Sequence, residues 1–389
     1  MIRLDSVSKK YPNGQLAVRD LSLDVPEGEI VVLVGPSGCG KTTTLKMINR
    51  LIEPTSGRIY LDGDDVTHVD PVELRRRIGY VIQQVGLFPH LTIGANVGTV
   101  PKLLGWDKAR VRKVSDDLLE LVGLDPGVYR DRYPNQLSGG QRQRVGVARA
   151  LAADPPVLLM DEPFGAIDPV TRARLQDEFL RLQGEVRKTI VFVTHDIEEA
   201  VKMGDRIAIL DVGGILAQYD TPAQILGDPT SHMVAEFVGA DRGLKRLKVT
   251  PIDPGGIEHP PTVRPDQTLA EARALMDAND SRFLVVVDDR GELRGHVRRV
   301  NALGEGSVHS RTEYIDSWVS SDDSLEHALA KMLLTDYGWV AVVDGQRYVG
   351  VLGPDAIYRA LRNSIDDAAE QTLGAATERA IDEGAELQP

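Results

Sequence analysis

The stretch that decides the fold is Ile30-Val31-Val32-Leu33-Val34, followed at once by Gly35-Pro36-Ser37-Gly38-Cys39-Gly40-Lys41-Thr42-Thr43. The first five residues are apolar and mostly β-branched, which is typical of a strand buried on both faces of a parallel sheet. The next run matches G-x-x-x-x-G-K-[ST], between that strand and a helix predicted over residues 43–49. Glycines let backbone N–H groups surround a phosphate, and the helix adds its positive N-terminal end. Residues 35–43 therefore predict a nucleotide phosphate site.

A second motif places two carboxylates at the end of another predicted strand. Val157-Leu158-Leu159-Met160 is followed by Asp161 and Glu162, and ligands bind at the carboxyl ends of strands in open parallel sheets. We expect Lys41 to reach the β- and γ-phosphates of ATP, and Thr42 and Asp161 to hold Mg²⁺. Glu162 is then placed to polarise the attacking water as a general base.

Strands and helices alternate through residues 1–240. Apolar runs at 189–194 and 207–210 predict two more buried strands. Leu175, Phe179 and Leu182 have helical spacing within a helix predicted over 169–183. The alternation predicts an α/β domain with a doubly wound parallel sheet.

Composition limits the function classes that this chain can serve. It has 389 residues, a net charge of −13, 42% hydrophobic residues, 5% aromatic residues and a single cysteine, Cys39. The acidic balance argues against a nucleic-acid partner, and one cysteine excludes an internal disulfide. No apolar run is long enough to cross a bilayer. We therefore expect a cytosolic protein of two or three domains.

An internal repeat begins after residue 261, with an offset of 56 residues. Val263 recurs as Val319, and Val286-Val287-Asp288 recurs as Val342-Val343-Asp344. Each copy is predicted as strand, helix, strand, turn, strand and helix, so that two copies bury one face against each other. We expect residues 241–261 to be a basic, proline- and glycine-rich linker, 262–308 and 309–365 to be the copies, and 366–389 to be a disordered acidic tail.

A third motif lies between the two nucleotide motifs. Leu137-Ser138-Gly139-Gly140-Gln141 looks like the signature motif of ATP-binding-cassette (ABC) ATPases. The resemblance covers residues 1–240 and implies a RecA-like P-loop core with a helical subdomain over about 88–145. It also implies that two copies form a dimer in which residues 138–141 of one copy close over ATP held by the other. Ser138 and the amides of Gly139 and Gly140 would then donate to the γ-phosphate.

The resemblance assigns roles to four further residues. Tyr11 matches the aromatic residue that stacks on adenine, and Gln83 matches the glutamine that senses the γ-phosphate and binds Mg²⁺. His195 matches the switch histidine that contacts the γ-phosphate. Asp168 ends Gly165-Ala166-Ile167-Asp168, which matches the loop that crosses the dimer, although the family usually has leucine where Ile167 stands.

The subfamily is indicated by two other features. Gly86-Leu87-Phe88-Pro89-His90-Leu91-Thr92 resembles importer ATPases, in which this stretch faces a membrane permease. We interpret Leu87 and Phe88 as an exposed anchor for that permease, and the alternative is that they complete the core of the helical subdomain. The C-terminal repeat resembles a tandem CBS module. The combination resembles the ATPase subunits of glycine betaine, carnitine, choline or proline betaine importers. It implies a peripheral motor subunit at the cytoplasmic face of the membrane, with permease subunits and an extracytoplasmic substrate-binding protein as partners.

The role of the CBS pair stays open at this point. CBS pairs that bind adenosine nucleotides often show Gly-x-x-Thr/Ser-x-x-Asp, whereas the copies here read Gly295-His-Val-Arg-Arg-Val-Asn301 and Gly350-Val-Leu-Gly-Pro-Asp355. A regulatory nucleotide, an ionic-strength input and a purely structural role in dimerisation are the three interpretations. Two other functions also stay open: an importer ATPase for an amino acid or polyamine, and a soluble nucleotide-regulated CBS sensor with incidental ATPase activity.

Overall fold

The computed structural model describes residues 1–82, 86–165 and 167–363. Gln83 and the acidic tail over 366–389 lie outside the described residues, so the expectations for them stay predictions. The chain divides into two compact units, each of which is described by itself. The first contains residues 1–225 and 229–239, and the second contains residues 226–228 and those from 240 onward.

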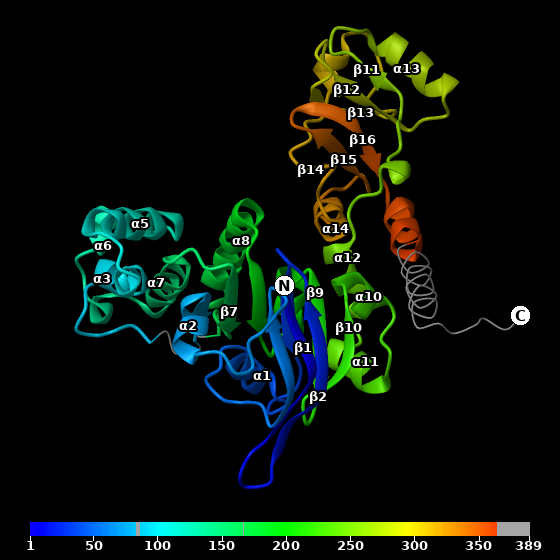
Figure 1. The fold of residues 1–389 in the computed structure, drawn as a ribbon. Coiled ribbons are helices and arrows are strands. Elements are labelled where there is room, and N and C mark those ends of the chain that lie inside the picture. The colour runs from blue at the N-terminus through cyan, green and yellow to red at the C-terminus, as the bar shows by residue number, and fades with distance from the viewer. Residues whose placement is uncertain (83–85, 166, 364–389) are drawn as a thin grey trace, which may run out of the picture. The chain divides into compact units, whose positions relative to one another are not determined.

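A six-stranded sheet forms the centre of the first unit (Figure 1). Its order is β10 (Ile215–Asp220), β9 (Arg206–Asp211), β3 (Ile30–Val34), β8 (Thr189–Val193), β7 (Val157–Asp161) and β6 (Ile78–Val81). All neighbours are parallel except the antiparallel pair β10 and β9. Every residue of β3, β7 and β8 is buried, as their continuous apolar runs predict. The α/β fold predicted from the sequence is confirmed.

An antiparallel sheet packs against this core through its apolar face. Its order is β2 (Leu16–Val25), β1 (Ile2–Lys10), β4 (Ser56–Leu61) and β5 (Asp64–Asp65). Leu4 and Leu21 from this sheet share one buried cluster with Leu33 and Val191 of the parallel sheet. The two sheets therefore share one buried cluster between them.

The helices within residues 1–239 follow the predicted alternation. They are α1 (Lys41–Ile48), α2 (Pro71–Arg76), α3 (Ile93–Val97), α4 (Thr99–Leu103), α5 (Lys108–Leu121), α6 (Pro126–Tyr129), η1 (Pro134–Gln136), α7 (Gly139–Leu151), α8 (Pro169–Val186), α9 (Ile197–Met203), α10 (Pro222–Gly227) and α11 (His232–Val238). Figure 1 shows α3, α5, α6 and α7 gathered in one helical group. The helix predicted over 169–183 is α8.

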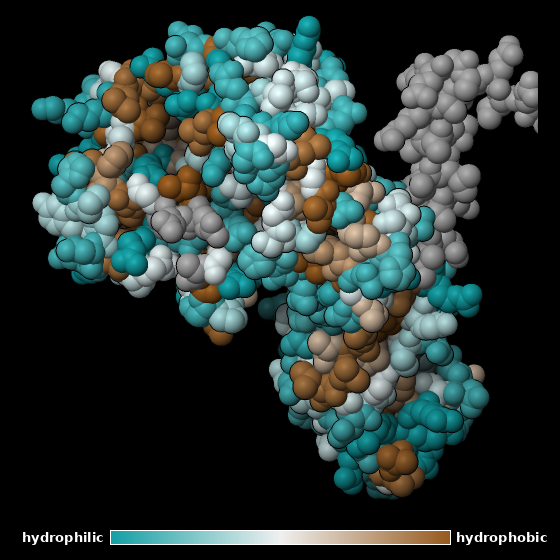
Figure 2. Space-filling view, turned by 90° about the horizontal axis from the view of Figure 1, so that it is seen from below, coloured by the Kyte–Doolittle hydropathy of each residue, from teal (hydrophilic) through white to brown (hydrophobic). Residues whose placement is uncertain are grey.

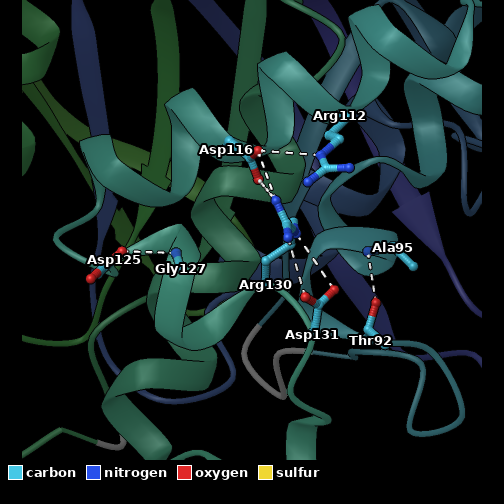
Figure 3. Close-up of polar contacts among 8 residues, drawn as sticks. All are labelled: Thr92, Ala95, Arg112, Asp116, Asp125, Gly127, Arg130 and Asp131. Carbon is cyan, nitrogen blue, oxygen red and sulfur yellow. Dashed lines mark hydrogen bonds and ion pairs between the residues drawn. The ribbon is translucent and has the colours of Figure 1, made fainter.

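One arginine ties this helical group together (Figure 3). The Arg130 guanidinium lies 3.1 Å from the Asp116 carboxylate on α5 and 3.2 Å from the carboxylate of Asp131. Its carbonyl accepts a 2.8 Å hydrogen bond from the Gly94 N–H at the start of α3. A Cβ at Gly94 would lie 2.5 Å from Arg130 Cγ, so only glycine allows this close packing. No motif in the sequence indicated this contact.

The second unit holds two three-stranded sheets, one from each copy of the repeat. The first copy contains β11 (Thr262–Val263), α13 (Leu269–Ala278), β12 (Phe283–Val287), β13 (Leu293–Arg298) and η3 (Val308–Arg311). The second contains β14 (Trp318–Ser320), α14 (Leu325–Leu333), β15 (Val340–Asp344) and β16 (Arg347–Leu352), and residues 354–363 are helical. In both sheets the first strand is parallel to the second and the third is antiparallel to it.

One local expectation differs from the structure of this unit, and the segment predicted as a linker contains helical elements. The final helix expected in the first copy is absent from residues 299–306, which form turns, because Gly304 and Gly306 adopt φ of 89° and 135°. The segment over 241–261 is not featureless, since it contains α12 (Arg242–Val249) and η2 (Pro254–Gly256). Leu247 of α12 is buried in one cluster with Leu325 of α14, which explains why a helix forms there.

The surface is polar, with apolar patches between the charged side chains on the face that Figure 2 shows. Among the described residues, no helix combines the length and the apolar character that spanning a bilayer requires.

Candidate active site

The loop between β3 and α1 has a backbone that only glycine permits at two positions. Gly35 and Gly40 adopt φ of 151° and 104°, and a Cβ there would lie 2.1 Å from the Leu210 carbonyl oxygen and 2.4 Å from that of Ala17. α1 begins at Lys41, so its N-terminal N–H groups face the loop. Phosphate oxygens are the ligands that such a ring of N–H groups binds.

The buried Lys41 ammonium already lies within this loop. Its Nζ donates to the carbonyl oxygens of Gly35 at 2.7 Å and Pro36 at 3.0 Å. The Sγ of Cys39, also buried, lies 3.6 Å from the same nitrogen. The backbone of the phosphate loop therefore holds the Lys41 ammonium, which the sequence predicts to bind phosphate, at the loop.

Two oxygen ligands meet beside the loop. The Thr42 hydroxyl donates a 2.9 Å hydrogen bond to Asp161 Oδ1 at the end of β7. Burial raises the pKa of the Asp161 carboxyl, and the hydrogen bond from Thr42 opposes that effect. Mg²⁺ prefers oxygen ligands and is commonly held by one or two carboxylates together with substrate phosphates. The pair fits this ion, and the described residues contain no cluster of three or more His, Cys, Asp or Glu side chains that would hold a metal without a nucleotide.

Glu162 and His195 form the second contact at this edge of the sheet. His195 Nδ1 lies 3.3 Å from Glu162 Oε1, and their side chains are 65% and 21% exposed. The Glu162 N–H donates a 2.9 Å hydrogen bond to the carbonyl of Val193, the last residue of β8. Glu162 has a φ of 46°, in the left-handed region that glycine favours. The neighbouring strands β7 and β8 thus bring the two side chains together.

The signature motif forms the N-terminus of another helix. Ser138 caps α7, because its hydroxyl accepts from the Gln141 N–H at 3.2 Å and the Gln141 side chain accepts from the Ser138 N–H at 2.9 Å. Ser138 and Gly139 are exposed. A Cβ at Gly140 would lie 3.9 Å from Ile167, so this motif adjoins the loop that ends at Asp168.

Asp168 and Tyr11 lie in elements other than the phosphate loop. Asp168 caps α8 by accepting from the Thr171 N–H at 3.0 Å, and this hydrogen bond lowers the pKa of its carboxyl. Ile167, the departure from the family pattern, is buried as an apolar residue. Tyr11 lies in the turn between β1 and β2, with Lys9 Nζ 5.6 Å from its ring centre. Among the described residues, no hydrogen bond or ion pair joins Tyr11, Ser138 or Asp168 to Lys41.

Sequence reasoning missed one buried carboxylate behind His195. Glu199 on α9 accepts a 3.0 Å hydrogen bond from Gln176 on α8. Burial raises the pKa of Glu199, and its hydrogen bonds with Thr194 and Gln176 lower it. Because Thr194 precedes His195, this carboxylate connects α8 to the segment that carries the histidine. Nothing in the spacing of the sequence marks it.

The sheet order, the phosphate loop and the paired carboxylates define a P-loop ATPase of the ABC type. The ABC transporter family matches residues 18–165, and the CBS domain family matches residues 256–305 and 311–363. The ATP-binding cassette MJ0796, solved as a dimer in a post-hydrolysis state with ADP and Pi, aligns with a TM-score of 0.52 at 38% identity, covering 57% of this chain and 99% of that one.

Curated relatives match over nearly the whole length. The chain is 48% identical over 357 residues to the glycine betaine/carnitine/choline transport ATP-binding protein OpuCA of Bacillus subtilis, which covers 90% of this chain and 93% of that protein. It is 46% identical over 366 residues to the osmoprotectant import ATP-binding protein OsmV of Salmonella typhimurium, covering 92% and 95%. The chain belongs to this family of ABC transporter ATP-binding proteins with a C-terminal CBS pair.

Proposed function

We propose that this chain is the ATP-hydrolysing motor of an importer for quaternary amine osmoprotectants such as glycine betaine, carnitine or choline. The observation that carries the ATPase activity is the meeting of Lys41, Thr42, Asp161, Glu162 and His195 at the carboxyl edge of β3, β7 and β8. The cargo class is supported by relatives with those names that match nearly the full length of the chain.

The chemistry follows from the positions of these side chains. The loop amides and the Lys41 ammonium bind the β- and γ-phosphates and stabilise charge as it develops. Glu162 accepts the proton of the water that attacks the γ-phosphate. The His195 ring, 3.3 Å away, orients that carboxylate. Mg²⁺, held by Thr42 and Asp161, would neutralise phosphate charge when it is bound with the nucleotide.

We propose a head-to-tail homodimer as the working form. Ser138 and Gly139 are exposed at the N-terminus of α7, where unpaired helix N–H groups attract an anion. The phosphate that these groups would bind belongs to ATP held by the second copy. We expect Glu162→Gln to dimerise with ATP, because the slow-turnover variant keeps both nucleotides at the interface. Size exclusion that shows only monomer with ATP would contradict the dimer.

The permease is proposed to dock at Phe88. This side chain is 42% exposed, while Asn96 holds its backbone by accepting from the Phe88 N–H at 2.7 Å and donating to the Phe88 carbonyl at 3.1 Å. Phe88, Leu51 and Val100 line a cleft of about 360 Å³. A fixed backbone with an exposed apolar side chain favours the anchor over the core interpretation. It supports the proposal that the chain works at the cytoplasmic face of the membrane.

Uptake measurements test the transport function and the cargo together. We expect membrane vesicles that hold this chain and its permease to accumulate labelled glycine betaine, carnitine or choline, and to lose that uptake with Lys41→Ala. Uptake of an amino acid or polyamine instead would reassign the cargo. Failure of any permease or extracytoplasmic binding protein to co-purify from membranes would favour the soluble CBS sensor.

A further inference from the structure

A cavity of about 650 Å³ opens between the two copies of the CBS repeat. Its wall comes from equivalent positions of the two copies: Asp280 and Phe283 precede and begin β12, and Asp336 and Trp339 stand 56 residues later, before β15. The copies are not identical here, because Ser281 and Arg282 of the first copy correspond to Tyr337 and Gly338 of the second. At this pair of positions the first copy therefore contributes Arg282 and the second contributes Tyr337.

Four rings gather on its wall. Phe283 and Trp339 stack with centres 4.7 Å apart and planes at 13°. Tyr337 lies 4.7 Å from Trp339 and 4.7 Å from the His296 ring. Trp339 is buried, whereas Phe283 and Tyr337 are partly exposed toward the cavity that they line. Aromatic rings carry negative faces to which positive groups bind, and Phe283 and Tyr337 are the two rings of this cluster with exposed surface at the cavity.

The charges around the rings also favour a cation. The carboxylates of Glu258, Asp280 and Asp336 line the cavity, and none of them forms an ion pair with another described residue. Arg298 is already paired with Glu313 at 2.9 Å. Arg282 is thus the one guanidinium lining the cavity that has no ion pair within the described part of the chain. A polyphosphate would meet more negative than positive groups here.

His296 on β13 is a buried polar group that the fold leaves without a hydrogen bond. Its side chain is 1% exposed, and neither Nδ1 nor Nε2 has a hydrogen-bond partner in the described structure. The nearest carboxylate, that of Glu313, lies 3.6 Å from Nε2. Buried polar atoms are normally bonded, so this ring, which lines the cavity, indicates a ligand.

We propose that this cavity binds a quaternary ammonium compound. The methylated cation would lie against Tyr337 and Phe283, close to the Asp280 and Asp336 carboxylates. A quaternary nitrogen has no N–H to donate, so ring faces and dispersed negative charge are the groups that recognise it. The methylated nitrogen cannot hydrogen-bond to His296, so a carboxylate or hydroxyl on the same ligand would bond to Arg282 or to the His296 ring. The CBS pair would thereby sense the imported solute inside the cell. This role rests on the proposed transport function.

Calorimetric titration of the full chain with choline tests the site. We expect one saturable site per chain, and at least tenfold weaker binding of 3,3-dimethyl-1-butanol, which has the shape of choline without its charge. Tyr337→Leu should weaken choline binding about tenfold, and Asp336→Asn severalfold. Tyr358→Leu, a matched change at an exposed tyrosine outside the cavity, should leave it unchanged.

Three results would overturn the proposal. The first is choline binding no tighter than its neutral isostere. The second is a choline affinity that stays unchanged both in Asp336→Asn and in a folded Tyr337→Leu. Asp336 is exposed, so its side chain can change without disturbing the fold. The third comes from titrations of the chain carrying Lys41→Ala. In that result adenosine monophosphate binds through Tyr337, while choline gives no heat of binding. Because the titration needs no permease, uptake without choline binding removes this inference alone, and choline binding without uptake removes the transport function alone.

Discussion

The phosphate loop and the cavity between the CBS copies each contain a buried polar group, but only the group in the phosphate loop is hydrogen-bonded within the described structure. Lys41 is bonded to two backbone carbonyls of its own loop, whereas neither ring nitrogen of His296 has a hydrogen bond in the described structure. Both sites need a glycine for close backbone approach: a Cβ would lie 2.4 Å from Ala17 O at Gly40 and 2.3 Å from Glu313 O at Gly295. The difference teaches that a site can be found either by its motif or by an unsatisfied group.

The largest expected effect is a loss of ATP turnover at the phosphate loop without a change in ligand binding at the CBS cavity. Lys41→Ala should lower ATP turnover by about two to three orders of magnitude, because a charge that stabilises the transferred phosphate is lost. Choline binding at the CBS cavity should stay unchanged. Phosphate release and calorimetry on the same preparation measure both quantities.

Lys46→Ala is the matched control for this change, since Lys46 is exposed on the same helix. It should retain turnover close to that of the unmodified chain. Equal losses in the two variants would mean that general helix charge, rather than the loop ammonium, supports hydrolysis.

The second effect concerns the backbone of the loop. Gly40→Ala should lower the free energy of unfolding by about 3 kcal/mol, because it combines a left-handed φ of 104° with a Cβ 2.4 Å from Ala17 O. Gly38→Ala has a φ of 79° and nothing within 4 Å of its Cβ, so it should cost about 1 kcal/mol. Calorimetric melting compares them, and equal losses would contradict the contact.

The smallest effect is a pH dependence at the other site. Burial lowers the pKa of His296, with Arg298 acting in the same direction and Glu313 opposing. The unfolded chain therefore takes up this proton at a higher pH than the folded chain, so the residue removes stability as the pH falls through about 6.5.

We expect His296→Phe to reduce this acid-induced loss of melting temperature by about 2–4 °C. His309→Gln, at an exposed histidine of the same unit, should not change it. A melting profile for His296→Phe that falls as steeply with pH as that of the unmodified chain would show that other groups cause the loss.

The two sites also differ in how far the sequence predicts them. The phosphate loop is contiguous, so strand, glycines and lysine could be placed from residues 30–43 alone, and the strand order then brought Asp161 to Thr42. The CBS cavity draws Phe283, His296, and the neighbouring Tyr337 and Trp339 from three segments that only packing unites. The 56-residue offset did pair Phe283 with Trp339, but it carried no signal that the rings stack.

Local backbone conformation set another limit on prediction. The helix expected after β13 was wrong because glycines at 304 and 306 turn the chain there, an effect that the repeat pattern hid. The contact of Arg130 with Asp116 was invisible for a different reason, since ion pairs between helices leave no period in the sequence.

The left-handed backbone at Glu162 has an evolutionary consequence. A side chain with a Cβ is disfavoured at a φ of 46°, so glycine at this position would make the folded protein more stable by about 1 kcal/mol while removing the carboxylate. A copy of the gene released from the need to consume ATP should drift toward glycine or asparagine here. A carboxylate retained at this position would mark a lineage in which the protein still hydrolyses ATP.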